Sequence, residues 1–379
     1  MKIGIRNIYV ILIATIMSVM GTLASRGSDS FSVLSVPYLY TIITIFLIIR
    51  FYKNPFVIPI NKPFLSLIGA CTISAVLNND EKMVISCICM FFIFSYLIKA
   101  SDELRVSLLI GTAMAQFVFL FRYGLTDSWN GNSVLTALAF VTIISLLSYL
   151  TNISDVILLI ITFAAGVIVI VMSSRTSIIA FFVSMICLFV IRYKKTTSWP
   201  VKLILLFVLL SCVVFRFREQ LTGVLFNKWA DRGYTGVNAL TGRGEIWINE
   251  LKHDWTFWGN GELYFDSTYH HNDAHNIFIQ VLGRYGTITL IVFMIFIISL
   301  AFFACKMKND SKMYVIPIAV AYIITGFFEN VLFLDCKMYI PSIIILIIAA
   351  TIICYKNSSK EDINANDLED SINDRINTE

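Results

Sequence analysis

The chain has 379 residues, of which 58% are hydrophobic and only 14% are charged, and its formal net charge is +4 at pH 7. About a quarter of the residues of a soluble globular protein are charged, so this composition excludes a soluble globular protein. The positive charge lies mostly in the loops between apolar runs and gives no reason to expect binding to nucleic acid.

Apolar runs of roughly 20 residues recur along the chain, and each can cross a ~30 Å hydrocarbon core as a helix. Within lipid the alternatives are helices and closed barrels, and continuous rather than alternating apolar runs favour helices. The sequence therefore predicts an all-α polytopic membrane protein with about twelve transmembrane helices. The first could pass for a signal peptide, but the many later spans favour an uncleaved helix. The predicted spans are 7–25, 32–49, 64–79, 83–98, 104–121, 133–150, 156–172, 177–191, 203–215, 286–304, 313–331 and 339–355.

Lysine and arginine are unevenly divided between the short loops on the two sides, which predicts the orientation of the chain. One side holds twelve of them: Arg50, Lys53, Lys62, Lys99, Arg105, Arg192, Lys194, Lys195, Lys202, Lys306, Lys308 and Lys312. The short loops of the other side hold five: Arg26, Lys82, Arg122, Arg175 and Lys337. The bias predicts that both termini are cytoplasmic and that the long loop between spans 9 and 10 is extracytoplasmic.

The predicted organisation has four parts. Transmembrane helices 1–9 occupy residues 1–215, an extracytoplasmic catalytic loop occupies 216–285, helices 10–12 occupy 286–355, and a polar cytoplasmic tail, expected to be disordered, occupies 356–379. The loop contains four of the six tryptophans, and disordered segments are poor in aromatic residues, so we expect it to fold.

Two helices are expected within or at the end of this loop. EIWINELKHDW, residues 245–255, has apolar residues at helical spacing and lies between glycine-rich breaks at TGRG and GNG. A second helix is expected to start near His275 and to run toward the next span, with Asn272 or Asp273 as its cap.

Two arginines could bind an anion at the extracytoplasmic face. Arg175, in SSRTS, lies in a very short loop between two apolar spans, where it could instead cap helix ends or extend its charge to the interface. Arg243, in TGRGEIW, lies between two glycines just before a predicted helix start, which favours phosphate binding; the alternative is a simple surface turn.

All four histidines lie between residues 253 and 275. His275 is the favoured candidate for acid–base catalysis because Asn276 and an apolar helical run follow it. A metal site built from His271, His275 and nearby carboxylates is the weaker alternative, because HNDAH lacks the glutamate of HExxH and no cysteine lies in the loop. Histidines that only satisfy local hydrogen bonds are the third interpretation.

Together these features suit glycosyl transfer from a lipid diphosphate donor. Arginines can neutralise a diphosphate, and a histidine or carboxylate can remove a proton from a hydroxyl. Aromatic residues of the loop can stack on sugar rings.

The chain resembles the bacterial O-antigen polymerases (Wzy-type) and O-antigen ligases, which have about ten to fourteen spans and one large periplasmic loop in the C-terminal half. The matching elements are SSRTS with Arg175, TGRGEIW with Arg243, GNGE at 259–262, and AHNIFIQVLGRYG at 274–286 with His275. The resemblance implies a GT-C-like fold and a metal-independent, inverting-type glycosyltransferase that uses no cofactor.

The resemblance also implies roles for particular residues. Arg175 and Arg243 would bind the diphosphate, and His275 would accept the proton of the attacking hydroxyl. Glu245 or Glu262 would orient His275 or act as the base in its place. Sugar or acceptor contacts are expected at Trp247, Trp255 and Asn276.

The main expectation is a polymerase of O-antigen or capsule repeat units. It would transfer the growing glycan from undecaprenyl diphosphate to a new lipid-linked repeat unit at the outer face of the cytoplasmic (inner) membrane. The expected partners are undecaprenyl-diphosphate-linked oligosaccharides, membrane lipid and a chain-length regulator, with no nucleic acid. Two alternatives remain: a ligase that moves the polymer to lipid A core or another acceptor, and a polysaccharide flippase or other transporter.

Overall fold

The computed structural model describes residues 4–26, 38–52, 61–123, 130–151, 153–172, 174–193, 243–270, 273–331, 333 and 339–356. Within these ranges every regular element is a helix. The helices are α1 (Ile5–Arg26), α2 (Tyr38–Tyr52), α3 (Lys62–Leu77), α4 (Glu81–Lys99), α5 (Asp102–Tyr123), α6 (Asn130–Leu150), α7 (Asp155–Val171), α8 (Arg175–Tyr193), α12 (Arg243–Asn249), the π-helix η4 (Glu250–Asp254), α13 (Tyr264–Tyr269), α14 (Ile277–Lys306), α15 (Asn309–Phe328) and a C-terminal helix, Tyr339–Lys356.

Eight of the described helices are long and apolar enough to cross a membrane, and α2, α3 and α7 are shorter apolar helices. Each of these eleven overlaps a predicted span. An all-helical polytopic membrane protein is therefore confirmed for the described part of the chain. The predicted span 203–215 and the polar tail from residue 357 lie outside the described residues.

Short polar side chains fix where several helices begin. Asn61 accepts a hydrogen bond from the backbone N–H of Phe64 at the start of α3, and Asp80 does the same for Met83 in α4. Such a cap satisfies a helix donor that has no partner within the helix, and its loss costs about 1 kcal/mol. Between α3 and α4 the chain reverses direction, and the two helices pack against each other.

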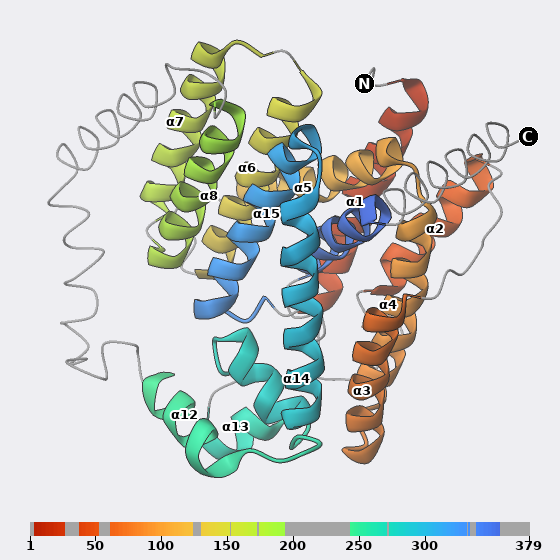
Figure 1. Ribbon diagram of the computed structural model, residues 1–379, viewed down its shortest axis with the longest axis vertical. Helices are drawn as coiled ribbons and strands as arrows, with labels where there is room; N and C mark the ends of the chain where they lie inside the picture. The colour runs from red at the N-terminus through yellow and green to blue at the C-terminus, as the bar shows by residue number, and fades with distance from the viewer. Residues whose placement is uncertain are drawn as a thin grey trace, which may run out of the picture.

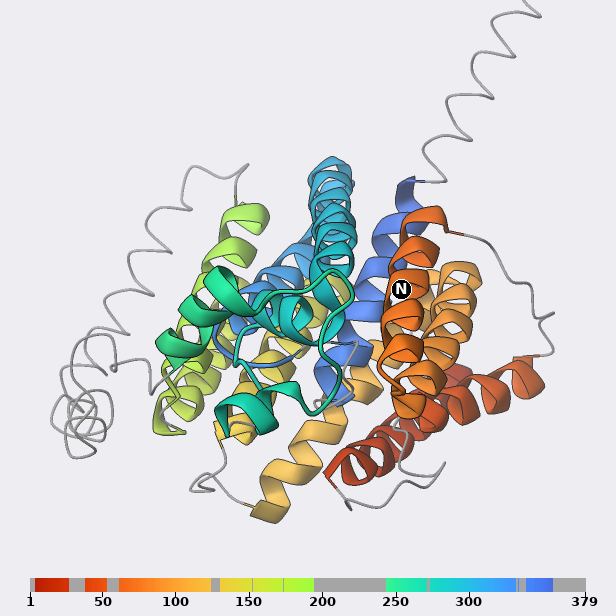
Figure 2. The ribbon, with the colours of Figure 1, turned by 90° about the horizontal axis from the view of Figure 1, so that it is seen from below.

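The bundle has two distinct ends. Figure 1 shows α1 starting at the top, and α12, α13 and the start of α14 lying at the bottom. We call the end with α12 and α13 the lower end, and the end with the α14–α15 turn the upper end. Seen from below in Figure 2, the green and teal segments cover part of the lower end.

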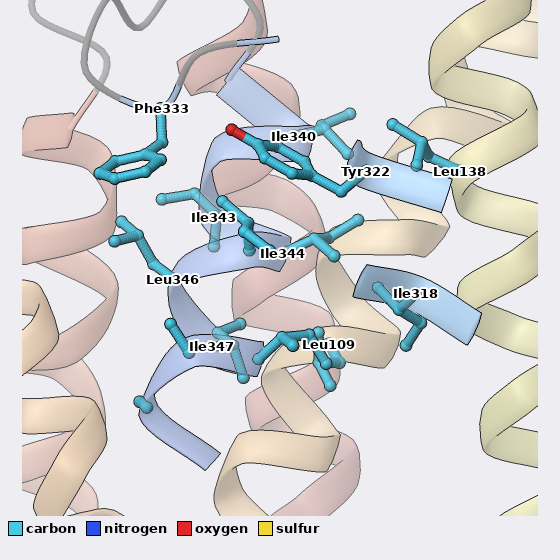
Figure 3. Packing of buried hydrophobic residues seen from close by; sticks show 14 of the residues in the cluster. Leu109, Leu138, Ile318, Tyr322, Phe333, Ile340, Ile343, Ile344, Leu346 and Ile347 are labelled. Atoms are coloured by element: carbon cyan, nitrogen blue, oxygen red, sulfur yellow. The ribbon is translucent and has the colours of Figure 1, made fainter. Parts of the chain in front are cut away.

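The C-terminal helix lies in the interior of the bundle. In its spanning window 83% of the residues are buried, whereas the figure for α14 is 28%. Its isoleucines pack against neighbouring helices, for example Ile344 and Ile347 near Leu109 of α5 and Ile318 of α15 (Figure 3). In lipid such packing is stabilised by van der Waals contact, because hydrocarbon is no less apolar than the side chains. α14, by contrast, presents much of its surface outward.

Helix α14 is broken at Gly286, which has φ 85° and ψ 175°. The break separates residues 277–285 from 287–306 and falls where the sequence predicted a membrane span to begin. Only glycine reaches this conformation without strain, and a Cβ at Gly286 would lie 2.3 Å from the carbonyl oxygen of Phe257.

The segment 256–261 satisfies the backbone groups that the break leaves without helical partners. The N–H groups of Asn260 and Gly261 donate to the carbonyls of Gly283 and Arg284, at 2.9 and 3.1 Å. On the other side of the break, Thr287 N–H donates to Thr256 O at 2.9 Å. Irregular backbone at a membrane is stable only when its polar groups are paired in this way. This segment therefore holds the first piece of α14 at a fixed angle.

Two expectations for the loop helices need correction or extension. The helix predicted from 245 begins at Arg243, and its second part is the π-helix Glu250–Asp254. The cap of the following helix is Asn276, so the expectation of Asn272 or Asp273 was wrong. Asp273 instead accepts a hydrogen bond from His275 N–H. This contact forms a local turn before the helix, and α14 begins only at Ile277.

Candidate functional site

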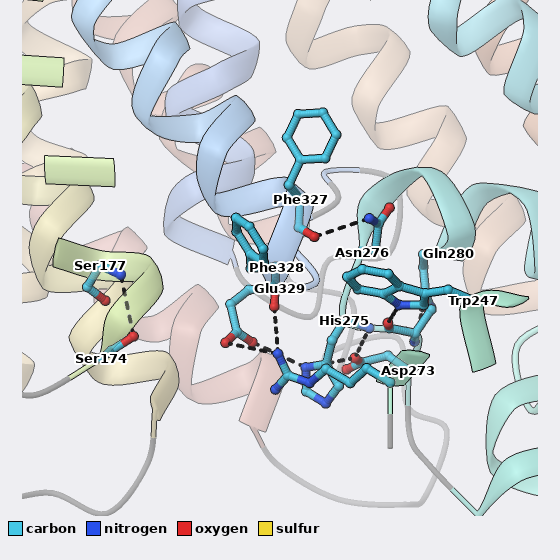
Figure 4. A network of polar contacts seen from close by, with 12 residues as sticks. Ser174, Ser177, Trp247, Asp273, His275, Asn276, Gln280, Phe327, Phe328 and Glu329 are labelled. Carbon is cyan, nitrogen blue, oxygen red and sulfur yellow. Dashed lines mark hydrogen bonds and ion pairs between the residues drawn. The ribbon is translucent and has the colours of Figure 1, made fainter. Parts of the chain in front are cut away.

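His275 lies at the lower end, directly before the cap of α14. Its backbone is in the left-handed region, with φ 51°, a conformation uncommon for residues other than glycine. Asp273 supports this turn, because its Oδ1 accepts the His275 N–H at 2.9 Å. The turn sends the His275 side chain away from α14, toward the end of α15 (Figure 4).

The neighbouring Asn276 joins the start of α14 to the end of α15. Its side-chain oxygen accepts from the N–H groups of Phe278 and Ile279, at 2.9 and 3.2 Å. Its Nδ2 donates to the carbonyl of Phe327, at the end of α15, at 3.1 Å. Asn276 is buried, so its observed role is to cap α14 and hold it against α15; a contact with sugar or acceptor stays a prediction.

Glu329 is the centre of the site, and sequence reasoning missed it. It is the C-cap residue of α15, and its side chain is 9% exposed. Its Oε2 lies 3.2 Å from His275 Nδ1, and its Oε1 lies 3.7 Å from Arg243 Nη1. Figure 4 shows this carboxylate between α15 and the loop. One buried carboxylate therefore brings together an arginine and a histidine that are separated by 32 positions in the sequence.

Arg243 is anchored at the same helix end. Its Nη1 donates to the carbonyl of Phe328 at 2.8 Å, and its side chain is 19% exposed. The C-terminus of a helix carries partial negative charge, which favours a cation there. Both contacts use Nη1, so the N–H groups on Nη2 and Nε can serve other acceptors.

A small apolar cluster positions Arg243 by holding α12 against the start of α14. Ile246, Phe265, Ala274 and Ile279 are its buried members, and Trp247, Tyr264 and Tyr269 pack against them. The indole N–H of Trp247 donates to Ala274 O at 2.8 Å, directly before His275 in the sequence. Trp247 was expected to contact sugar; its observed contacts are structural.

A buried hydrogen bond supports this cluster. The Tyr264 hydroxyl donates to Glu250 Oε2 at 2.7 Å, and Glu250 is fully buried in the π-helix. Burial raises the pKa of the Tyr264 hydroxyl, and the bond to Glu250 raises this pKa further. The phenol therefore stays protonated at neutral pH and remains a donor to the carboxylate.

Arg175 lies at the same end of the bundle. It is the first residue of α8 and is exposed. Helix α8 packs closely against α15, and the two run in opposite directions (Figure 1). The start of α8 is therefore beside the end of α15, where Glu329 lies, and Ser174 and Ser177 mark this position in Figure 4.

The remaining predicted site residues lie on the surface of the loop. Glu245 and Glu262 are exposed, and the carboxylates within 4 Å of His275 among the described residues are Asp273, at 3.3 Å, and Glu329. The structure therefore does not bring Glu245 or Glu262 to the histidine. Trp255 is 48% exposed and contacts Phe257 edge-on, with ring centroids 6.2 Å apart.

A sequence signal for Glu329 did exist. It is the only charged residue in the predicted span 313–331. An ionisable residue within a span is a functional candidate by default, so this signal points to Glu329.

The described residues contain no group of three His, Cys, Asp or Glu side chains arranged to hold a metal ion. The chemistry available from the described side chains is therefore that of two guanidinium groups, an imidazole and the carboxylates beside it. Metal independence itself stays a prediction.

Residues 158–294 match a protein family described as O-antigen ligase. This segment runs from α7 into α14 and contains Arg175, Arg243 and His275, while Glu329 lies beyond it. The match confirms the resemblance to the O-antigen polymerase and ligase family over this segment, and with the apolar helices it indicates an integral membrane protein. A search of curated proteins found no match to the chain.

Proposed function

We propose that the chain transfers a glycan from a polyprenyl-diphosphate carrier to a sugar hydroxyl at the membrane surface, as a polymerase of polysaccharide repeat units. The donor is an undecaprenyl-diphosphate-linked chain, and the acceptor is a new lipid-linked repeat unit. The observation that carries this proposal is the network in which Glu329 contacts both Arg243 and His275, at the bundle end where Arg175 begins α8.

Two arginines can stabilise the departing diphosphate. When the bond between the anomeric carbon and the phosphate oxygen breaks, negative charge collects on the leaving diphosphate. Arg243 can offer its Nη2 and Nε donors while Nη1 keeps it anchored to Phe328 and Glu329. Arg175 is exposed at the same end, and its planar group can bind phosphate oxygens in a bidentate manner. The two arginines lie at one end of the apolar bundle, and this position suits a substrate with a lipid tail buried in the membrane and a polar head outside it.

His275 can accept the proton of the attacking hydroxyl. Its Nδ1 faces two carboxylate groups, Asp273 and Glu329, at 3.3 and 3.2 Å. Carboxylate acceptors favour the tautomer with the proton on Nδ1, which leaves a lone pair on Nε2. As the hydroxyl oxygen bonds to the anomeric carbon, its proton moves to Nε2, and the two carboxylates stabilise the resulting imidazolium. This is a single displacement, which inverts the anomeric configuration.

A ligase is the second candidate, because the matching family carries that description. Both enzymes would use the same donor chemistry, and they differ in the acceptor. A deletion strain separates them: loss of a polymerase leaves single repeat units on the surface lipid, whereas loss of a ligase leaves polymer on its lipid carrier. Gel analysis of both the surface and the carrier-linked glycan reads out this difference.

The proposal is tested with purified protein in liposomes and a synthetic undecaprenyl-diphosphate oligosaccharide. We expect His275→Ala, Arg175→Ala and Arg243→Ala each to lower the rate of glycan transfer by at least about 10²-fold, the scale of acid–base and charge stabilisation. Each variant should accumulate normally in the membrane. A chelator should leave the wild-type rate unchanged. Normal glycan transfer by His275→Ala would refute His275 as the base. A wild-type protein that transfers glycan neither to a lipid-linked repeat unit nor to a lipid A core acceptor would refute glycosyl transfer.

A further inference from the structure

An apolar cavity of about 180 Å³ lies near the upper end of the bundle, away from the candidate site. Three helices line it: α14 with residues such as Leu300, Ala301 and Cys305, α15 with Ile316 to Ile323, and the C-terminal helix with Ile345 to Ile352. Ala301 and Cys305 are exposed, so the cavity opens to the outer surface of the bundle. Along α14 the lining runs from Ile297 to Cys305, about 12 Å at the rise of a helix.

The cavity lies on a surface that faces hydrocarbon. α14 is the least buried of the described candidate spans, and Ile295, Ile298 and Phe302 on it are all more than half exposed. A dry apolar cavity does not hold ordered water, because water needs polar partners. In a bilayer, a long apolar chain is the material available to fill it.

Each of the three lining helices carries a lysine within one turn of the cavity. Lys306 follows Cys305 on α14, Lys312 precedes Ile316 on α15 by four positions, and Lys356 follows Ile352 by four on the C-terminal helix. Positions four apart share a helix face. Lys312 and Lys356 therefore share helix faces with lining residues, whereas Lys306 lies about 100° around α14 from Cys305.

Contacts with aromatic rings direct two of these lysines away from the cavity, because neither ring belongs to its lining. Lys306 Nζ lies 4.1 Å from the ring centroid of Phe302, and Lys356 Nζ lies 4.1 Å from that of Phe303. The second contact joins the C-terminal helix to α14 outside the cavity lining. Such contacts orient an ammonium group without neutralising its charge.

The charges around the cavity mouth are mainly positive. Lys308 adds a fourth lysine in the α14–α15 turn, and Asp310 is the acidic residue of this turn. The nearby Arg105 is already engaged, since it pairs with Asp102 at 2.7 Å and donates to the carbonyls of Leu97 and Ala100. Lys308 and Lys312 are therefore the cations placed to meet an anionic group at the cavity mouth.

We infer that this cavity is a binding site for an anionic phospholipid of the surrounding bilayer. One acyl chain lies in the cavity between α14, α15 and the C-terminal helix, and the phosphate lies beside Lys308 and Lys312. Basic pockets between membrane helices recognise anionic lipid head groups in this way, each lysine contributing about a fivefold preference. This inference goes beyond the proposed glycosyl transfer and does not depend on it.

Native mass spectrometry of the whole protein in detergent tests the head-group part. Phosphatidylglycerol and phosphatidylcholine with identical chains are added separately, and the retained lipid is counted. We expect one phosphatidylglycerol to be retained at a concentration at least about fivefold lower than phosphatidylcholine. The double variant Lys308→Gln, Lys312→Gln should lose that preference. Lys82→Gln, a single charge removed at the lower end, should keep it.

The chain part is tested with Ala301→Phe, which fills the cavity mouth from an exposed position. It should reduce retention of both lipids, whereas Ile298→Phe, on the same helix outside the cavity lining, should not. Equal retention of the two lipids by the wild type, or unchanged retention in Ala301→Phe, would overturn the inference. The inference would also be overturned if inorganic phosphate alone, or equimolar undecaprenyl phosphate, displaced the bound phosphatidylglycerol. Formation of a dimer in place of lipid binding would overturn it too.

Discussion

Glu329 is the residue on which the candidate site depends, because it contacts Arg243 and His275 and belongs to neither of their segments. It is nearly buried, so its charge is balanced by these partners rather than by water. A carboxylate in this position can orient the imidazole, stabilise its protonated form and hold the arginine near the substrate phosphate.

The first prediction at this scale concerns Glu329→Gln. The amide keeps the size and a hydrogen-bond acceptor but cannot balance an imidazolium, so kcat for glycan transfer should fall by about 10²-fold with little change in KM. Glu329→Asp should restore part of the rate. Glu245→Gln, at an exposed carboxylate in the same loop, is the matched control and should transfer normally. Equal activity of Glu329→Gln and Glu245→Gln would refute the role of Glu329.

The second prediction concerns the shape of the arginine. Arg243→Lys keeps the charge, but an ammonium bound to Phe328 O and Glu329 has few donors left for a diphosphate, whereas the guanidinium has a planar fork. We expect Arg243→Lys to retain no more than about a tenth of the wild-type kcat/KM, the loss for one charge-assisted hydrogen bond. Full activity in Arg243→Lys would show that charge alone is sufficient.

At the scale of elements, the broken helix α14 places the site. The hydrogen bonds from segment 256–261 hold the break, and Ser74 and Asn78 fix that segment to α3 through the carbonyl of Trp258, at 2.6 and 3.3 Å. The first piece of α14 starts with Asn276 against the end of α15. We therefore expect the contact between His275 and Glu329 to depend on the break.

A pair of glycine substitutions tests this arrangement. In Gly286→Ala the alanine would have to adopt a positive φ, and its Cβ would lie 2.3 Å from Phe257 O. The substitution should therefore destabilise the protein by about 1–3 kcal/mol or more and lower the rate of glycan transfer. In α3, Gly69→Ala meets nothing within 4 Å and should be neutral or stabilising by up to about 1 kcal/mol. Thermal unfolding in detergent measures the difference between the two variants. If Gly286→Ala and Gly69→Ala unfold at the same temperature, the break in α14 is not required for stability.

At the scale of the whole molecule, the bundle separates a lower end with the candidate site from an upper end rich in lysine. The described helices alternate in direction, so Arg175, Arg243 and His275 share one end, and the α14–α15 turn lies at the other (Figure 1). The positive-inside rule then predicts that the upper end faces the cytoplasm.

Labelling of introduced cysteines with an impermeant maleimide tests this topology in intact cells. Arg175→Cys and Ser267→Cys should react from outside, and Lys308→Cys should react only after permeabilisation. The native Cys305, exposed near the upper end, provides the background for comparison. Reaction of position 175 from the opposite side to position 267 would separate Arg175 from the site and end the proposal of a two-arginine diphosphate site.

The sequence by itself determined the helical membrane architecture and most of the chemical groups of the site. Continuous apolar runs leave helices as the way to pair backbone groups in lipid, which is a local requirement. The motifs SSRTS, TGRG and AHN are also short-range signals, because neighbouring residues in the sequence indicate that a charged or proton-transfer residue lies beside a helix start. The same local reading gave the wrong cap for α14, since the Asp273–His275 turn competes with helix initiation.

Only the tertiary structure decided which carboxylate serves the histidine. Glu245 and Glu262 are near His275 in the sequence and lie on the loop surface, whereas Glu329 is 54 positions away and lies 3.2 Å from it. That contact depends on the glycine break in α14, on Asn276 joining α14 to α15, and on the apolar cluster under α12. Each is a contact between segments distant in the chain, and the free energy of such packing belongs to the assembled bundle rather than to any one stretch of residues.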